Sequence, residues 1–249
     1  MNKAVGIIPA RWNSTRFPGK PLHPIAGKPL LRHVWERCVR AKYLDSVIIA
    51  TDDMRIADAA FDWGAEVALT SSKHRSGTDR VAEVARKTKQ FAYVINVQGD
   101  EPLIEPRLID KLVEKLRSNR NVGIVTAAHP FESPVAALSP NQVKVVVDRT
   151  DRALYFSRAK IPFPRSSSGI KYLRHQGIYG FRRDVLLQFV KWKPAPLERA
   201  ESLEQLRALE NGVKVHVLIT AVGSPGIDTP EDAMALQQKL ARSKRRKLL

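Results

Sequence analysis

The chain opens with an alternation of short apolar runs and helical patterns, and this alternation restricts its fold more than any other feature. The apolar runs cover residues 4–8, 47–51, 66–70, 93–97 and 123–128. The segments between most of them carry apolar residues at helical spacing. Strands that alternate with helices of this length predict an α/β fold with a mostly parallel central sheet flanked by helices. Such sheets bind ligands at the carboxyl ends of their strands, so functional residues are expected there.

The expected helices between these strands cover residues 28–43, 54–63, 78–89 and 106–117. From about residue 130 to 180 the alternation breaks, and further strands are expected at 142–148, 153–157 and 171–181. This part is predicted to be an antiparallel extension that covers the site or pairs subunits. A single helix over 196–210, a strand over 214–219 and a final helix after residue 228 complete a single domain over 1–249, which ends in a disordered basic tail at 242–249.

Composition narrows the class of protein. No apolar run approaches the ~20 residues that span a bilayer, so no membrane partner is expected. Met1 leads directly into the first strand, so no cleaved signal peptide is expected, and the single cysteine, Cys38, favours a reducing cytoplasm. The net charge of +17 makes a nucleic-acid-binding protein an alternative. The charge is spread along the chain, however, which favours an anionic small molecule over nucleic acid as the partner.

The loop after the first strand, residues 9–22, holds three prolines and a glycine, so it can be neither helix nor strand interior. It also carries three cations, Arg11, Arg16 and Lys20. Arginine offers a planar fork of donors, lysine a point charge, and unpaired backbone N–H groups complete a phosphate site. The alternative is a solvated surface loop. Because long loops in compact domains are usually functional, the phosphate interpretation is favoured.

A second informative stretch, Gln98-Gly99-Asp100, follows the strand at 93–97. Gly99 permits a close backbone approach, and Asp100 is expected at the same sheet edge as the cationic loop. A carboxylate that faces a phosphate chain suggests Mg²⁺, which takes one or two carboxylates together with phosphate oxygens. The alternative is that Asp100 caps the following helix, but that helix begins several residues later.

Asp228 is the candidate for a second metal carboxylate. The final helix already has a capping box in Thr229 and Asp232, with Pro230 at its first position. Helix capping therefore does not need Asp228, which leaves its carboxylate available for a cation.

Other residues, taken alone, indicate structural roles. Ser76-Gly77-Thr78 reads as a helix cap with Thr78 as the N-cap residue, and His175 as a structural histidine. Glu204 and Gln205 read as part of a solvated helix face. The chain has no G-x-G-x-x-G, Walker A, zinc-ligand or G-x-S-x-G pattern, so the sequence gives no sign of a dinucleotide fingerprint, a P-loop, a zinc site or a hydrolase nucleophile.

Together these stretches resemble the 3-deoxy-manno-octulosonate cytidylyltransferases (CMP-KDO synthetases), sugar nucleotidyltransferases with a Rossmann-like fold. The matching segments run almost end to end and include IIPARWNSTRFPGKPL, SGTDRVAEVA, NVQGDEPLI, ALYFSRAKIPFPR, RHQGIYGF and GIDTPEDA. The resemblance implies a Mg²⁺-dependent enzyme, working as a cytoplasmic homodimer, that joins CMP from CTP to the anomeric hydroxyl of KDO. The products are pyrophosphate and CMP-KDO for lipopolysaccharide synthesis. A related acceptor, 8-amino-KDO or a sialic acid, is the alternative, because other nucleotidyltransferases share the first loop.

The resemblance also implies roles for individual residues. The nucleotide-binding residues are Ala10, Arg11, Ser14, Arg16, Lys20, Ser76, Gly77, Thr78 and Gln98. Asp100 and Asp228 match the metal ligands and, with Arg11 and Lys20, form the catalytic set. The sugar-acid residues are Arg158, His175, Tyr179, Glu204 and Gln205, and this replaces the structural interpretation of His175, Glu204 and Gln205. The antiparallel extension is accordingly expected to bind the sugar and to form the dimer.

Overall fold

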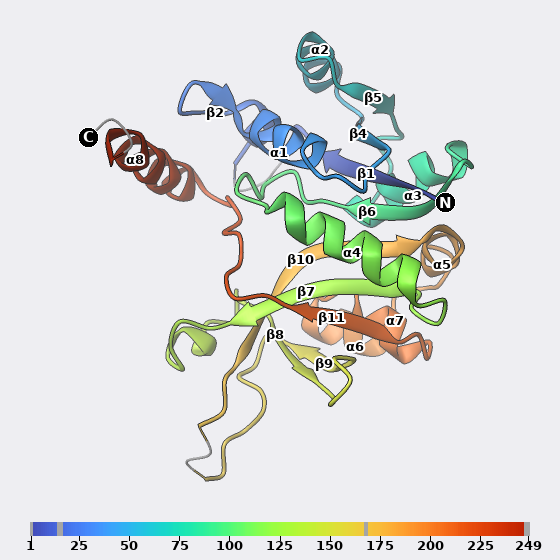
Figure 1. The fold of residues 1–249 in the computed structure, drawn as a ribbon, viewed down its shortest axis with the longest axis vertical. Helices are drawn as coiled ribbons and strands as arrows, with labels where there is room; N and C mark the ends of the chain where they lie inside the picture. Colours follow the sequence, from blue (N-terminus) through green and yellow to red (C-terminus); the bar gives the residue numbers. More distant parts are fainter. Residues whose placement is uncertain (1, 14–16, 167–168, 247–249) are drawn as a thin grey trace. The chain divides into compact units, whose positions relative to one another are not determined.

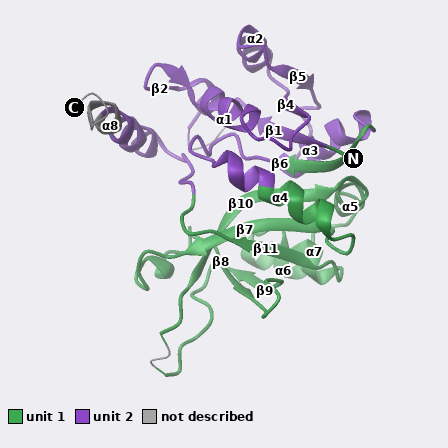
Figure 2. Ribbon diagram, in the orientation of Figure 1, with its two compact units in different colours: residues 1–3, 90–95, 111–223 green, residues 4–89, 96–110, 224–249 purple. Residues whose placement is uncertain are grey.

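The computed structural model describes residues 2–13, 17–166 and 169–246, with the backbone alone for 242–246 (Figure 1). The chain forms two compact units (Figure 2). Unit 1 comprises Met1–Lys3, Gln90–Ile95 and Lys111–Gly223, and unit 2 comprises Ala4–Lys89, Asn96–Asp110 and Ser224–Leu249. No helix in the described part of the chain has both the length and the apolar composition needed to cross a membrane.

Unit 2 contains a parallel sheet in which β4 (Ser46–Thr51) lies between β1 (Lys3–Ala10) and β5 (Glu66–Leu69). Three helices alternate with these strands along the chain: α1 (Leu30–Val39), α2 (Met54–Asp62) and α3 (Gly77–Lys87). After β1 the chain forms a short 3-10 helix, η1 (Lys20–Leu22), and a two-stranded antiparallel sheet of β2 (Pro24–Ile25) and β3 (Lys28–Pro29). The last helix, α8 (Pro230–Arg246), also belongs to this unit.

An apolar cluster in unit 2 joins the first loop and the residues that follow it to the start of α8. It contains Phe17, Ile25, Leu30, Ile227, Ala233 and Leu236, with Leu103 and Leu240 packed against it. Residues near the amino terminus thereby contact the start of α8, roughly 200 positions further along the chain. This cluster is what brings the segment that carries Asp228 beside the segment that carries Lys20.

Unit 1 is built on β6 (Phe91–Asn96), β7 (Ile124–Pro130), β10 (Leu173–Arg182) and β11 (Val215–Ile219). β11 pairs with β7 in parallel, whereas β10 runs antiparallel to β7. Two more strands, β8 (Lys144–Val147) and β9 (Ala153–Ser157), form an antiparallel ladder that pairs with β10. The helices of unit 1 are η2 (Ala136–Leu138), α5 (Arg183–Phe189), α6 (Pro196–Glu201) and α7 (Leu206–Glu210). A further helix, α4 (Pro106–Ser118), begins in the sequence of unit 2 and ends in that of unit 1.

These elements confirm the α/β fold with a mostly parallel central sheet, including the antiparallel strands expected between residues 130 and 180. The boundaries of several elements differ from those expected, including the first helix, which covers Leu30–Val39 rather than 28–43, and three differences have a clear physical meaning. β1 continues through Pro9 and Ala10, since the fixed φ of proline suits extended backbone. The helix expected over 196–210 is two helices, because Ser202 adopts a left-handed conformation with a φ of 52°. The backbone of residues 242–246 is helical rather than disordered.

Candidate active site

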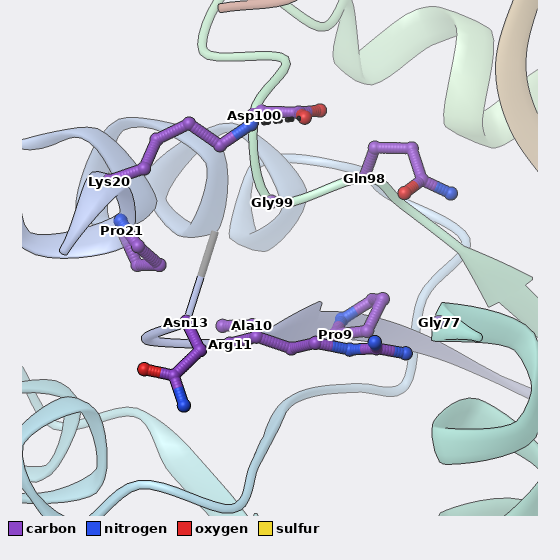
Figure 3. Close-up of a pocket in the computed structure, with 10 residues that line it drawn as sticks. All are labelled: Pro9, Ala10, Arg11, Asn13, Lys20, Pro21, Gly77, Gln98, Gly99 and Asp100. Atoms are coloured by element: carbon purple, nitrogen blue, oxygen red, sulfur yellow. Dashed lines mark hydrogen bonds and ion pairs between the residues drawn. The ribbon is translucent and has the colours of Figure 1, made fainter. Parts of the chain in front are cut away.

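A cavity of about 310 Å³ opens in unit 2 (Figure 3). Its lining residues are Pro9, Ala10, Arg11, Asn13, Lys20, Pro21, Gly77, Gln98, Gly99 and Asp100. They come from the end of β1, the loop that follows it, the first turn of α3 and the segment after β6. The structure therefore gathers at one place the two stretches that the sequence singles out. The volume lies at the lower end of the range for small-molecule sites.

The first loop is closed on itself by its own backbone. The Gly19 amide donates to the Trp12 carbonyl at 3.0 Å, and Gly19 has a φ of 69°, a conformation that favours glycine. A side chain at Gly19 would also meet the Trp12 ring, since a Cβ there would lie 3.2 Å from it. Ser14 and Arg16, which the sequence also predicts to bind the nucleotide, lie outside the residues that the structure describes.

An arginine from α2 holds Trp12 from outside the loop. The Arg55 guanidinium lies 3.6 Å from the centre of the Trp12 ring. Asp53 fixes that guanidinium, accepting from Nε at 2.9 Å and from Nη2 at 2.6 Å. This stack anchors the start of the loop, so Arg11 and Asn13 are presented to the cavity from a braced backbone.

We expect Trp12→Ala to raise the KM for a nucleotide substrate by about tenfold with a smaller effect on kcat, because the loop loses its anchor but keeps its charges. Steady-state kinetics would measure both constants. Trp63→Ala is the matched control, since Trp63 also lies under an arginine, Arg32 at 6.0 Å, but does not line the cavity. Equal KM values for the two variants would contradict the anchoring role.

Lys20, Asp100 and Asp228 meet beside the cavity. Lys20 Nζ donates to Asp100 Oδ2 at 2.7 Å and to the Ile227 carbonyl at 2.9 Å, and it lies 3.7 Å from Asp228 Oδ1. Figure 3 shows the Lys20 side chain extended toward Asp100. The Ile227 amide donates to the Asp100 carbonyl at 2.9 Å, which ties the two acidic segments together. The sequence-based pairing of these two aspartates therefore has a geometric basis.

Gly99 sets the depth of the cavity between these groups and β1. A Cβ at Gly99 would lie 3.0 Å from the Pro9 carbonyl oxygen and 3.4 Å from a Leu31 methyl group. The backbone of the Gln98–Asp100 segment thus lies directly against the end of β1. Only glycine permits this approach without a shift of backbone.

The three residues expected on the base side of a nucleotide divide into two groups. Gly77 lines the cavity, whereas Ser76 and Thr78 do not. Ser76 is the N-cap of α3: its hydroxyl accepts from the Asp79 amide at 3.1 Å, and Asp79 accepts from the Ser76 amide in return. The expectation that Thr78 caps this helix is wrong, because the capping box begins two residues earlier.

The donor chemistry beside the cavity fits a hard divalent cation. Among the described residues there is no cluster of three or more His, Cys, Asp or Glu side chains that could hold a metal alone. Two carboxylates and a backbone carbonyl do converge there, however, and they converge on a cationic group. Mg²⁺ commonly takes one or two carboxylates and fills its other positions with water and phosphate oxygens.

A second group of candidate residues, all in unit 1, surrounds the end of β9. The Arg158 amide donates to Glu201 Oε2 at 2.8 Å, and its Nε donates to the Glu201 carbonyl at 2.7 Å. Its Nη2 reaches the Ser202 carbonyl at 3.4 Å. Arg158 therefore satisfies carbonyls at the C-terminus of α6 and fixes the break between α6 and α7.

His175 and Tyr179 lie together on β10, with ring centroids 5.5 Å apart. A bulge between Gln176 and Tyr179 shifts the register against β7. Thr126 bridges the bulge: its hydroxyl lies 2.7 Å from the Ile178 carbonyl and 3.2 Å from the Gln176 carbonyl, both of which can only accept, and 2.9 Å from His175 Nε2. This network assigns the proton to Nε2 and leaves Nδ1 as an acceptor.

Burial tunes the titration of both side chains. It lowers the pKa of His175 to about 3, so the imidazole is neutral at physiological pH. Burial, with a smaller contribution from the Glu204 carboxylate, raises the pKa of Tyr179 well above its usual value. Both groups thus act as uncharged hydrogen-bonding groups rather than as a proton-transfer pair at neutral pH.

The shifted pKa of His175 predicts a pH dependence of stability. Between pH 6.5 and about 3 the unfolded chain binds a proton at this residue and the folded chain does not, so its contribution to stability is lost as the pH falls through that window. We expect His175→Gln to show a shallower loss of unfolding free energy on acidification. Denaturant unfolding at several pH values measures this, and parallel curves for the two proteins would contradict it.

Glu204 and Gln205 lie in the connection between α6 and α7, and Gln205 is buried. A buried ion pair joins α6 and α7 on the two sides of this connection. The Arg207 guanidinium contacts both oxygens of Glu198, with Nε at 2.8 Å from Oε2. The Arg207 guanidinium also lies over the Phe189 ring at 4.9 Å. The structure thus places the five expected sugar-acid residues on neighbouring elements of unit 1.

Sequence reasoning missed several contributors to these sites. Asn13 and Pro21 line the cavity, but within the predicted loop neither was singled out, and no sequence signal indicated that the Ile227 carbonyl faces Lys20. Glu201 accepts from both the Ser157 hydroxyl and the Arg158 amide. Its proximity to Glu204 and Gln205 in the sequence was a hint, but its partners depend on tertiary contacts.

Comparison with known proteins gives a consistent result. A family model described as cytidylyltransferase matches residues 5–215. A 3-deoxy-manno-octulosonate cytidylyltransferase from Syntrophobacter fumaroxidans is 50% identical over 243 residues, covering 96% of this chain and 97% of the relative. A 3-deoxy-manno-octulosonate cytidylyltransferase from Fusobacterium nucleatum is 45% identical, covering 92% of this chain and 94% of the relative.

Two solved structures resemble this chain to different degrees. The structure of a CMP:2-keto-3-deoxy-manno-octonic acid synthetase complexed with CTP has a TM-score of 0.94 and 41% identity, and the match covers 97% of this chain and 100% of that chain. A 4-diphosphocytidyl-2C-methyl-D-erythritol synthase from Anaerococcus prevotii has a TM-score of 0.65 and 17% identity, over 96% of this chain and 99% of that one. The second likeness concerns the fold alone.

Proposed function

We propose that this chain, which belongs to the family of 3-deoxy-manno-octulosonate cytidylyltransferases, joins the cytidylyl group of CTP to 3-deoxy-manno-octulosonate (KDO). The observation that carries this function is the likeness, at 41% identity over 97% of the chain, to a synthetase of this kind in complex with CTP. The products are CMP-KDO and pyrophosphate. The enzyme class places the reaction in lipopolysaccharide synthesis.

The reaction needs an attacking oxygen held in line with the leaving pyrophosphate. The oxygen of the anomeric hydroxyl bonds to the α-phosphorus of CTP, the bond from that phosphorus to the bridging oxygen breaks, and the hydroxyl proton is released. No covalent intermediate with the protein is required. Catalysis therefore depends on positioning and on charge stabilisation.

The cavity of unit 2 supplies that stabilisation in our proposal. Arg11 and Lys20 line it, as does Gly77 in the first turn of α3. Cations and helix N-termini stabilise the negative charge that accumulates on a departing pyrophosphate. Ala10 and Gln98 complete the nucleotide contacts, with Ser14, Arg16, Ser76 and Thr78 as the remaining nucleotide-binding residues that the family pattern suggests.

Asp100 and Asp228 would hold Mg²⁺, since their carboxylates converge at one cation position. Mg²⁺ bound there supplies charge neutralisation and orientation of the reacting oxygens. The fold contributes by fixing both aspartates: the Ile227–Asp100 backbone hydrogen bond and the apolar cluster around Ile227 keep the two segments in register.

Arg158, His175, Tyr179, Glu204 and Gln205 would bind the sugar acid. The neutral His175 and Tyr179 suit hydroxyl groups, because each can donate and accept a hydrogen bond without a charge. Arg158 contributes positive charge for a carboxylate while its guanidinium fixes the α6–α7 connection. An acceptor with a sialic acid or 8-amino-KDO skeleton is the less favoured alternative, since the curated relatives carry the KDO name.

Release of pyrophosphate from each of the four nucleoside triphosphates, with and without KDO, tests the function. We expect release only with CTP and KDO together. A panel with 8-amino-KDO and a sialic acid in place of KDO then tests the acceptor. Faster turnover with either analogue would assign the chain to that acceptor, and release without any acceptor would contradict the proposed reaction.

We also propose a cytoplasmic homodimer that pairs through the antiparallel extension of unit 1. Exposed apolar side chains support this, since Phe163 is 84% and Leu154 is 62% exposed. A cytoplasmic location is supported by the CTP substrate and by the single, buried cysteine. Light scattering of the purified protein measures the mass, and a monomer would contradict the proposed dimer.

A further inference from the structure

The proposed reaction needs the Lys20 ammonium near the phosphates of CTP, but in the structure this ammonium contacts acidic side chains instead. Expected as a phosphate ligand, Lys20 instead points its Nζ at three oxygen groups: Asp100 Oδ2 at 2.7 Å, the Ile227 carbonyl at 2.9 Å and Asp228 Oδ1 at 3.7 Å. Its side chain is 15% exposed, against 30% for Asp100 and 52% for Asp228. The ammonium is therefore the most sheltered member of the group and lies where the acidic segments converge.

A divalent cation and this ammonium compete for the same oxygens. Mg²⁺ binds oxygen at 2.0–2.1 Å and carries two charges. An ammonium that contacts the same carboxylates would lie within a few ångströms of the metal, where two cations repel strongly in a partly sheltered site. Occupation of the same oxygen atoms by both cations at once is therefore strongly disfavoured.

The lysine is well placed to give way. Its backbone belongs to η1, which the cluster of Phe17, Ile25 and Leu30 holds in place, so movement is confined to the side chain. That side chain has a flexible four-carbon stem and already lines the cavity. Rotation away from Asp100 would leave Nζ within the cavity, beside the position proposed for the triphosphate.

We propose that Lys20 is an internal counter-ion of the metal site: it neutralises Asp100 and Asp228 before substrate arrives and is displaced by the divalent cation that enters with the nucleotide. The displaced ammonium then becomes a phosphate ligand. This inference rests on the proposed function, and it adds a switch between two sets of partners to the single role expected for Lys20. With this switch, the affinity of the site for a divalent cation is low without nucleotide and high when nucleotide is bound.

Binding of Mn²⁺ alone to the full-length, nucleotide-free protein tests the inference, with free Mn²⁺ measured by electron paramagnetic resonance. We expect Lys20→Met to bind Mn²⁺ at least about tenfold more tightly than the unaltered protein, because the competing cation is gone. Lys28→Met is the matched control: it also removes one positive charge from unit 2, but its partner is Glu36 at 2.8 Å. The control should change Mn²⁺ affinity less than about twofold.

Unchanged or weaker Mn²⁺ binding by Lys20→Met would overturn the inference. Lys20→Gln, which keeps a hydrogen-bond donor for Asp100, guards against a folding defect, and circular dichroism melting would check both variants. Adding Asp100→Asn to Lys20→Met should abolish the gained affinity, and retention of it would place the Mn²⁺ elsewhere and also overturn the inference. CTP-dependent pyrophosphate release by the unaltered protein tests the proposed function separately, so the two can fail independently.

Discussion

Asp100→Asn is expected to lower kcat about 100- to 1000-fold while the fold stays intact, which corresponds to about 3–4 kcal/mol of transition-state stabilisation. The amide oxygen can still accept from Lys20 Nζ, now 2.7 Å from Asp100 Oδ2, so the local packing survives. The negative charge that would hold Mg²⁺ is lost. Pyrophosphate release under saturating CTP and KDO measures the effect.

Asp58→Asn is the matched control for that variant. Asp58 lies on the exposed surface of α2 in the same unit and does not line the cavity. It should keep the turnover of the unaltered protein, which separates the position of the charge from its mere removal. Turnover of Asp100→Asn within about threefold of the control would exclude a central role for Asp100.

Arg207→Met is expected to cost about 3–5 kcal/mol of folding stability, the largest structural effect among the changes considered. The Arg207 side chain is 9% exposed and the Glu198 side chain 11% exposed, so the substitution leaves a buried carboxylate without its partner. The connection between α6 and α7, which carries Glu204 and Gln205, should loosen first. Urea unfolding followed by circular dichroism measures the loss.

Two further variants are needed to interpret the stability of Arg207→Met. Glu198→Gln combined with Arg207→Met should recover much of the stability, because no unpaired charge then remains. Arg152→Met, which breaks the more exposed pair with Asp148 in the same unit, should have a much smaller effect. A loss from Arg152→Met as large as that from Arg207→Met would show that the buried pair has no special importance.

Most of the helices and strands could be predicted from local sequence patterns. The strand at 153–157 and the start of the helix at 54 agree with the structure residue for residue, because apolar spacing and flanking polar residues mark them. The break at Ser202 could not be predicted, since a left-handed serine depends on contacts made by Arg158, more than 40 positions earlier. Helix patterns contain no information about such distant partners.

The candidate site was predictable in composition but not in geometry. Position after a strand identified Arg11 and Asp100, since both follow apolar runs whose carboxyl ends share an edge. The partners of Lys20 were not predictable, because the choice between phosphate and carboxylate depends on where Asp228 returns to the first loop. The stack of Arg55 on Trp12 was equally unpredictable, because the segment that contains Trp12 carries no information about a partner on a distant helix.

The apolar cluster that joins Phe17 and Ile25 to Leu236 has a practical meaning for handling this protein. Because α8 helps to hold the segment of Asp228, shortening the chain into that helix would disturb the carboxylate that immediately precedes it and its contact with Lys20 near the amino terminus. Affinity tags and fusion partners should therefore be appended beyond the helix and never spliced into it. By packing against Phe17 and Ile25, α8 supports the first loop, which lies near the opposite end of the polypeptide.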